Sequence, residues 1–352
     1  MPLIIEAKKM GFEPVLFYGN NKKYNNPSAY LDVIHDLSEQ YNFKVYPFSE
    51  TISSHPAKIT FMVEGRGHPF IKYETKKVVL ASTGDFAFVY DDYIKHVDNV
   101  ILVSKFVAEY YGKVSPKNLY LGSPKYSVQL NETEILKKYN LPTSKKALIL
   151  YPNLRSSICP PWHMQYPKSI SDHLKYDLEY IYDWLRVFGF SIIVKTRGKH
   201  AVQSKGRRGD FFFKDFSWYP HSTMELIKTC DLVINFDSAA IKECVMLGKP
   251  VINFPVRPEV EIYKIDGLCP RRDGRSFDFL YRYSYCEEIK SNIFSISNPT
   301  QSQKKDAKIC LQQAVDKLLQ NNHGNSFLDA RKNHLFINEH DVPRMILEAI
   351  TV

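Results

Sequence analysis

The sequence predicts an α/β protein with two doubly wound, Rossmann-like domains, and three observations lead to this prediction. The chain has 352 residues, more than one compact core usually holds, so two domains of roughly 150–200 residues are expected. Short β-branched runs alternate with amphipathic stretches, as in a parallel sheet covered by its crossover helices. Runs such as Leu148–Leu150 and Ile192–Val194 are apolar on both faces, which is typical of buried parallel strands.

The expected strands form two series along the chain. The first series consists of Pro14–Gly19, Lys44–Phe48, Ile59–Glu64, Lys77–Ala81, Asn99–Ser104 and Asn118–Leu121. The second series consists of Ala147–Tyr151, Ser191–Thr196, Asp231–Phe236 and Val251–Phe254. Amphipathic helices are expected over Ala29–Tyr41, Ser171–Phe188 and Ser222–Thr229.

The N-terminus departs from the usual order of such a domain. Pro2–Met10 is predicted to be a helix, whereas a doubly wound domain normally opens with a strand. The first strand is therefore expected to be missing from the first domain. Two explanations fit equally: a start site downstream of the ancestral one, or a trimmed domain.

The segment Ser123–Lys146 joins the two series and sets the domain limits. Asn131 is expected to cap a short helix, with Glu134 reaching back to it. Pro142 ends that helix because proline restricts the preceding residue and cannot continue the turn. The prediction is a first domain over residues 1–144, a second over 145–335, and a C-terminal helix over 336–352 that packs back across the domains.

Composition and charge exclude several classes of protein. Apolar residues make up 44% and charged residues 24%, which excludes disordered, collagen-like and disulfide-scaffold proteins. The six cysteines form no Cys-x-x-Cys pair, so neither a zinc ribbon nor a thioredoxin-like motif is expected. No apolar run reaches the roughly 18–20 residues of a membrane span, and no signal peptide is recognisable. A cytoplasmic protein is expected, with peripheral association at a membrane surface left open.

A net charge of +9, from 47 basic and 38 acidic residues, suits a phosphate-bearing ligand, nucleic acid or an anionic membrane. The densest basic clusters are Lys205–Arg208 and Arg271–Arg275. Neither is interleaved with stacking aromatic residues as in single-strand binders. No nucleic-acid partner is therefore expected, and two solvated loops are the preferred explanation of the basic clusters.

Thr229–Pro255 is the most informative stretch. A strand leads into a turn at Ser238, which is expected to be the N-cap of a helix beginning at Ala239. Small residues there would leave the first-turn amides open to a bulky anion, which the helix dipole favours. Glu243 lies about one and a half turns along, where its carboxylate can accept hydrogen bonds from a ribose. A capped helix without any ligand explains the same residues.

Three cations are expected at the same sheet edge as Ser238. Arg155 follows one predicted strand, while Lys195 and Arg197 end the next. Ligands of open α/β sheets bind outside the carboxyl ends of the strands, and these cations would offset charge developing on a leaving nucleoside diphosphate. The alternative is that they are surface residues that merely close strands.

The acceptor side offers competing candidates for a general base. Asp85 lies in Ala81–Asp85, after a buried strand, where Gly84 permits close backbone approach. Glu64 and His68 lie in a second loop and compete for the same role.

Several motifs resemble those of GT-B-fold enzymes. Thr229–Pro255 resembles their donor-nucleotide signature, which non-hydrolysing UDP-N-acetylglucosamine 2-epimerases share: Asp-Ser-Gly-Gly, two residues, then Glu, followed by Gly-Lys-Pro and a strand. Asp237, Ser238 and Glu243 match, whereas Ala239 and Ala240 replace the glycines. Further resemblances, to GT-B enzymes, to CDP-glycerol glycerophosphotransferases and to surface-carbohydrate transferases, occur in Asn99–Tyr111, Leu121–Ser127, Leu141–Arg155 and Ile192–Lys199.

The resemblance implies two Rossmann-like domains that face each other across a cleft. It also implies a glycosyltransferase that moves a sugar from a nucleotide-activated donor, with UDP or GDP expected, to a glycan or lipid-linked acceptor hydroxyl. No separate cofactor is expected. The sequence has no Asp-x-Asp pair, and adjacent Asp91 and Asp92 would point about 100° apart on a helix, so a metal-independent reaction is predicted.

Three alternatives remain. The first is a polyol-phosphate transferase of the CDP-glycerol type. The second is an epimerase. The epimerases have a His-x-Glu loop in the first domain, and this sequence has no such pattern, which argues against epimerisation. The third is a basic protein that binds nucleic acid or a membrane surface and is not an enzyme.

Overall fold

A computed structural model of the chain describes residues 1–18, 28–47, 56–63, 75–81, 97–110, 112, 114–151, 180–196, 209–214, 218–236, 238–254, 278–289, 300–335 and 341–351. The chain divides into two compact units. The first unit comprises Met1–Val128, Asp266–Ser276 and Lys332–Val352, and the second comprises Gln129–Ile265 and Phe277–Arg331. Residues 129–144, which the sequence analysis assigned to the first domain, cluster with the second unit.

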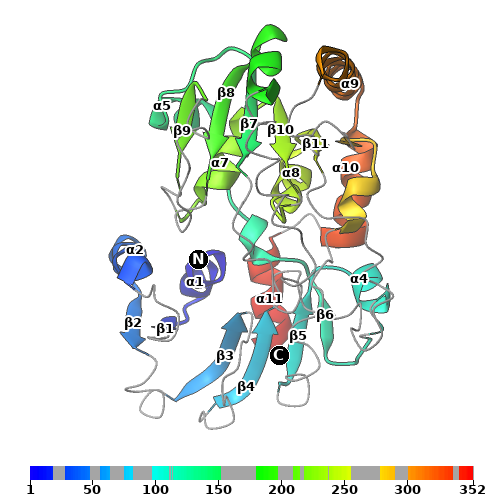
Figure 1. The fold of residues 1–352 in the computed structure, drawn as a ribbon. Helices are drawn as coiled ribbons and strands as arrows, with labels where there is room; N and C mark the ends of the chain where they lie inside the picture. Colours follow the sequence, from blue (N-terminus) through cyan, green and yellow to red (C-terminus); the bar gives the residue numbers. More distant parts are fainter. Residues whose placement is uncertain are drawn as a thin grey trace, which may run out of the picture. The chain divides into compact units, whose positions relative to one another are not determined.

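The first unit contains two parallel sheets (Figure 1). Strands β1 (Val15–Tyr18) and β2 (Lys44–Pro47) pair with each other. A second sheet has the order β3-β4-β5-β6, with bounds Ala57–Val63, Thr75–Ala81, Asn99–Leu102 and Asn118–Tyr120. The described helices of the first unit are α1 (Pro2–Lys9), α2 (Ser28–Tyr41), α4 (Lys105–Tyr110), η5 (Pro124–Tyr126) and α11 (Val342–Thr351). All six strands expected in this half are confirmed.

The C-terminal helix α11 belongs to the core of the first unit. Val342, Ile346 and Ile350 recur at every fourth residue, so one face of the helix is apolar. This face packs with Ala7 of α1 and Ile101 of β5 in one buried cluster. The Nζ atom of Lys77 also donates a hydrogen bond to the carbonyl of Ile350, at 2.8 Å. The predicted C-terminal helix is therefore present, and its apolar face explains where it packs.

The second unit is built on a six-stranded parallel sheet. The strand order is β12-β11-β10-β7-β8-β9. In chain order the strands are β7 Lys146–Leu150, β8 Ser191–Lys195, β9 Phe211–Phe213, β10 Leu232–Asn235, β11 Val251–Asn253 and β12 Cys286–Glu288. The four strands predicted here are confirmed, whereas β9 and β12 were missed. Each has three residues, and Cys-Glu-Glu in β12 offers no apolar run for a pattern to find.

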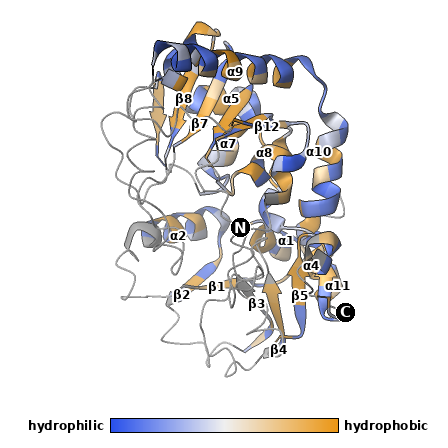
Figure 2. Ribbon diagram, turned by 45° about the vertical axis from the view of Figure 1, so that its right-hand side comes forward, coloured by the Kyte–Doolittle hydropathy of each residue, from blue (hydrophilic) through white to orange (hydrophobic). Residues whose placement is uncertain are grey.

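One face of this sheet carries a large buried core. Residues 180–187 are helical and lie with α9 (Gln301–Gln320) on this face. Ile181 and Leu185 pack with Ile149, Ile234 and Leu311 in one cluster. Figure 2 shows the strands as hydrophobic and α9 as largely hydrophilic, as expected for a helix with one buried stripe.

The other face carries the shorter helices. These are α5 (Glu132–Lys138), α7 (Ser222–Thr229) and α8 (Ile241–Leu247), and α8 is in contact with η10 (Asp278–Arg282) and α10 (Gly324–Ala330). The π-helical turn Arg331–Leu335 follows α10, and all of its residues after Arg331 belong to the first unit. Asn131 caps α5 as predicted, because its side chain accepts hydrogen bonds from the amides of Thr133 and Glu134. His221, whose Nδ1 atom accepts from the amide of Thr223, caps α7.

Candidate functional site

The strand order of the second unit contains a topological switch point between β7 and β10. The chain runs outward from β7 to β8 and β9, then returns to β10 on the opposite side of β7 and continues to β11 and β12. Right-handed crossovers then place residues 180–187 and α8 on opposite faces. At such a point the loops after the two central strands diverge, and ligands bind outside the carboxyl ends of the strands. The geometry points to the end of β10 and its neighbours as the candidate site.

The loop after β10 differs from the prediction in one respect. Helix α8 begins at Ile241 with Ala240 as its N-cap residue, and no side chain caps it. Ser238 therefore does not cap the helix. Its Oγ atom instead accepts a hydrogen bond from the amide of Ala240, at 3.3 Å. Such a local bond is favoured because a serine side chain easily closes a turn on the backbone two residues ahead.

The turn also uses amides that were expected to be open. The amide of Ile241 donates to the carbonyl of Ser238, and that of Lys242 donates to Ala239, at 3.2 and 3.1 Å. Within the described part of the chain, the amides of Ser238 and Ala239 have no hydrogen-bond partner. Of the described amides in this turn, the two that precede the helix, those of Ser238 and Ala239, are therefore the ones that can bind an anion.

Lys195 is the last residue of β8 and lies level with the end of β10, just before the turn that contains Ser238. It pairs with Leu150 of β7, and the β7–β10 register makes Leu150 level with Asn235. Neighbouring strands lie about 4.8 Å apart, so the ends of β8 and β10 are separated by about 10 Å. The side chain is only 4% exposed, and its Nζ atom donates to the carbonyl of Thr196 at 2.8 Å. The predicted cation and the turn at Ser238 thus share one sheet edge.

Glu243 is buried, with 6% of its surface exposed, in the first turn of α8. A glutamate is rarely buried unless its carboxylate has partners. Burial raises the pKa of the neighbouring Cys244 thiol well above its usual value, and the charge of Glu243 raises it further. Glu243 is therefore not an exposed residue on the surface of the helix.

A row of polar side chains that the sequence analysis missed ends three adjacent strands. Asn235 pairs in register with Asn253, and Asn253 pairs with Glu288. Registered residues of parallel strands point to the same face, and hydrogen bonds link the three side chains in turn. The available signal was that both β10 and β11 are apolar strands that end in asparagine.

The remaining predicted site residues lie outside the described residues. These are Arg155, Arg197, Asp85, Glu64 and His68, together with Asp237 of the turn. Their assignments stay predictions. Among the residues that the structure does describe, no three His, Cys, Asp or Glu side chains are grouped as a metal site. In the same part of the chain, every helix is too short or too polar to cross a bilayer.

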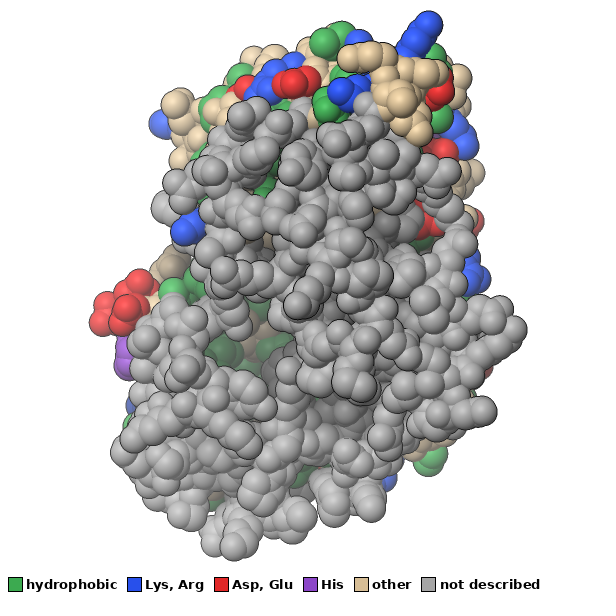
Figure 3. All heavy atoms as spheres, viewed as in Figure 1, with side chains coloured by type: hydrophobic (Ala, Val, Ile, Leu, Met, Phe, Trp, Pro, Cys, Tyr) green, Lys and Arg blue, Asp and Glu red, His purple; other side chains and the backbone are tan. Residues whose placement is uncertain are grey.

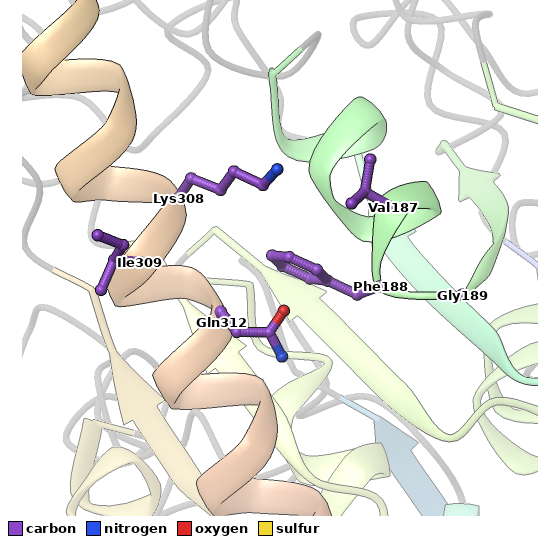
Figure 4. A pocket seen from close by; sticks show the side chains of 6 residues that line it. All are labelled: Val187, Phe188, Gly189, Lys308, Ile309 and Gln312. Atoms are coloured by element: carbon purple, nitrogen blue, oxygen red, sulfur yellow. The ribbon is translucent and has the colours of Figure 1, made fainter.

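A surface hollow of about 660 Å³ is lined by none of Lys195, Ser238 and Glu243. Figure 4 shows its lining, from the end of the helix over 180–187 and from α9: Val187, Phe188, Gly189, Lys308, Ile309 and Gln312. Gly189 precedes the start of β8, so the hollow lies toward the amino ends of the strands, opposite the switch-point edge. In Figure 3, acidic and basic side chains are mixed near α9, so the described surface there is not a single basic patch.

Comparisons with known proteins reveal the fold. No family model and no curated protein sequence matches the chain at a significant level. The wall teichoic acid polymerase TagF superposes with a TM-score of 0.54 and 15% identity, covering 96% of this chain and 88% of that one. The UDP-GlcNAc 2-epimerase from Methanocaldococcus jannaschii, in complex with UDP-GlcNAc and UDP, gives 0.53 and 13%, covering 99% and 95%. A putative UDP-N-acetylglucosamine 2-epimerase from Listeria monocytogenes gives 0.53 and 11%, covering 99% and 91%.

These identities are low, so the likeness concerns the fold. The chain has the GT-B-like fold that the motif resemblance implied, with parallel sheets in two units. The predicted fold class is confirmed.

Proposed function

We propose that this chain is a transferase that uses a nucleoside-diphosphate-activated donor, most specifically a glycosyltransferase acting on an acceptor hydroxyl. The observation that carries the proposal is the switch-point edge of the second unit. That edge combines a buried cation at the end of β8, two turn amides after β10 and a buried carboxylate in α8. The fold shared with a polymerase and with sugar-nucleotide epimerases supports it.

The chemistry of the donor assigns a role to each group. Lys195 and the amides of Ser238 and Ala239 suit the two phosphates, because amides and ammonium groups donate to anionic oxygens. Glu243 suits the ribose hydroxyls, because a carboxylate only accepts hydrogen bonds. Displacement at the anomeric carbon would release the nucleoside diphosphate, whose charge these donors would offset together with Arg155 and Arg197.

The acceptor would be a glycan or lipid-linked hydroxyl, deprotonated by Asp85, Glu64 or His68. We propose no metal for this reaction, because the sequence lacks an Asp-x-Asp pair. The donor would be the only nucleotide required, with UDP or GDP expected.

Polyol-phosphate transfer is the second candidate, and the similarity to TagF favours it. Attack would then occur at phosphorus, and the leaving group would be a nucleoside monophosphate. The released nucleotide therefore separates the two reactions: a diphosphate indicates glycosyl transfer, and a monophosphate indicates polyol-phosphate transfer.

A thermal-shift panel tests the proposal without knowledge of the acceptor. UDP, GDP and CDP are each added in excess EDTA, with uridine as the control for binding without phosphate. A ligand at one hundred times its dissociation constant stabilises the native state by about 2.7 kcal/mol. We expect at least one diphosphate to raise the melting temperature and uridine to raise it far less. A chain that none of the three diphosphates stabilises would not be the proposed transferase.

A further inference from the structure

The polar row at the strand ends continues into a clamp on the turn after β10. The Nδ2 group of Asn235 donates to the Oδ1 atom of Asn253 at 3.2 Å, and Asn253 donates to Glu288 at 3.1 Å. Asn235 and Asn253 are both fully buried. The row therefore ties the ends of β10, β11 and β12 together beneath the turn.

Tyr281 of η10 joins this row to the turn itself. Its hydroxyl accepts a hydrogen bond from Asn235 at 3.0 Å and donates one to the carbonyl of Ser238 at 3.2 Å. The Nδ2 group of Asn235 approaches the same carbonyl at 3.4 Å. Two side-chain donors, one from a residue 43 positions away in the sequence, thus join the Ile241 amide at the Ser238 carbonyl.

The orientation of the Asn235 amide follows from its neighbours. Its nitrogen faces the Oδ1 atom of Asn253 and the carbonyl of Ser238, which only accept hydrogen bonds, as well as the Tyr281 hydroxyl. Exchanging nitrogen and oxygen would bring the amide oxygen against these two acceptors. Its Oδ1 atom has no hydrogen-bond partner among the described residues. The contacts of the Asn235 nitrogen connect the end of β10 to β11, to η10 and to the turn after β10. The network therefore holds the backbone of this turn from two neighbouring elements.

We propose that Tyr281 is a positioning residue for donor binding. Its hydroxyl and the Asn235 amide hold the Ser238 carbonyl, and this fixes the backbone that presents the amides of Ser238 and Ala239 to the phosphates of a nucleoside diphosphate. The inference rests on the proposed function for its ligand, whereas the clamp itself is a property of the unliganded chain. Segment η10 thereby controls the phosphate-binding geometry without touching the ligand.

The test compares Tyr281→Phe with Tyr285→Phe in the full chain. Each variant loses one hydroxyl from the same part of the chain, but the Tyr285 hydroxyl donates to Leu280 and not to the turn. Hydrogen exchange of the amides at 240–242 reports on the turn without any ligand. Calorimetry with UDP, GDP and CDP reports on binding, and thermal melting reports on stability.

Hydrogen exchange at 240–242 is expected to accelerate most in Tyr281→Phe. Nucleotide affinity should fall about fivefold to tenfold in that variant, as one neutral hydrogen bond accounts for. Tyr285→Phe should lower the melting temperature, and its effects on exchange and affinity should be smaller, because its hydroxyl holds Leu280 of η10 and does not reach the turn.

Unaltered exchange in Tyr281→Phe, or equal acceleration in both variants, would overturn the clamp. If hydrogen exchange accelerates in Tyr281→Phe as expected but its nucleotide affinity is unchanged, Tyr281 does not position the donor. If the wild-type chain binds no nucleotide while the exchange result holds, the proposed function falls, and the positioning role falls with it although the clamp stands.

Discussion

Lys195 and Glu243 are charged residues that the fold buries almost completely, at 4% and 6% exposure. Charged side chains are rarely buried without a specific reason. Sequence pattern identified both residues because each lies next to a strand end or a helix start. It did not reveal their burial, which depends on the helices that the tertiary fold places over the sheet edge.

The two residues should differ in the part of the donor that they recognise. Lys195→Met should weaken UDP binding about tenfold to a hundredfold, because hydrogen bonds to charged groups are worth about 1.5–3 kcal/mol. It should leave uridine binding nearly unchanged.

Glu243→Gln should weaken the binding of UDP and of uridine by similar factors, since both ligands carry the ribose. Titration calorimetry measures all four values. Equal losses for both ligands in Lys195→Met would remove this lysine from the phosphate site.

Asn235, Asn253 and Tyr281 show where sequence reasoning stops at the residue scale. The two asparagines end apolar strands, so a strand pattern treats them as termini and gives no reason to connect them. The role of Tyr281 becomes visible only in the folded structure, where η10 lies beside the turn. Their network depends on the register between neighbouring strands, and the sequence pattern does not predict that register.

At the scale of single elements, the two ends of α8 depend on different signals. Gly248 ends the helix in a left-handed conformation, at φ 65° and ψ 37°, which is the usual role of a glycine just after a helix. The predicted start of the helix, Ala239, lies two residues before the observed start, because Ser238 closes the preceding turn and does not cap the helix. Capping residues and turn residues are chemically alike, so sequence alone does not separate them here.

Gly248→Ala should destabilise the protein by about 1 kcal/mol. Among the described residues, only an Arg331 nitrogen lies within 4 Å of a Cβ added at Gly248, at 3.7 Å. The expected cost is therefore that of a left-handed backbone without glycine. Gly248→Asn should cost less, because asparagine tolerates this conformation better. Urea unfolding of both variants checks the order. Equal or reversed losses would show that backbone conformation is not what this position requires.

For the whole molecule, the fold was predictable because it depends on periodicity and not on individual contacts. Apolar runs of strand length alternating with amphipathic stretches led to ten strands that the structure confirms. The short edge strands β9 and β12 escaped because three residues carry too little pattern. The acceptor-side candidates Asp85, Glu64 and His68 lie outside the described residues, so that half of the site still rests on sequence alone.

The central claim is that a nucleoside diphosphate binds at the switch-point edge of the second unit. The most direct measurement is hydrogen exchange of the full chain with and without the diphosphate that gives the largest thermal shift. The account predicts slower exchange at residues 238–243 and 195–196, and no change in the α9 hollow at residues 308–312. Protection confined to the hollow, or elsewhere with residues 238–243 unaffected, would contradict it.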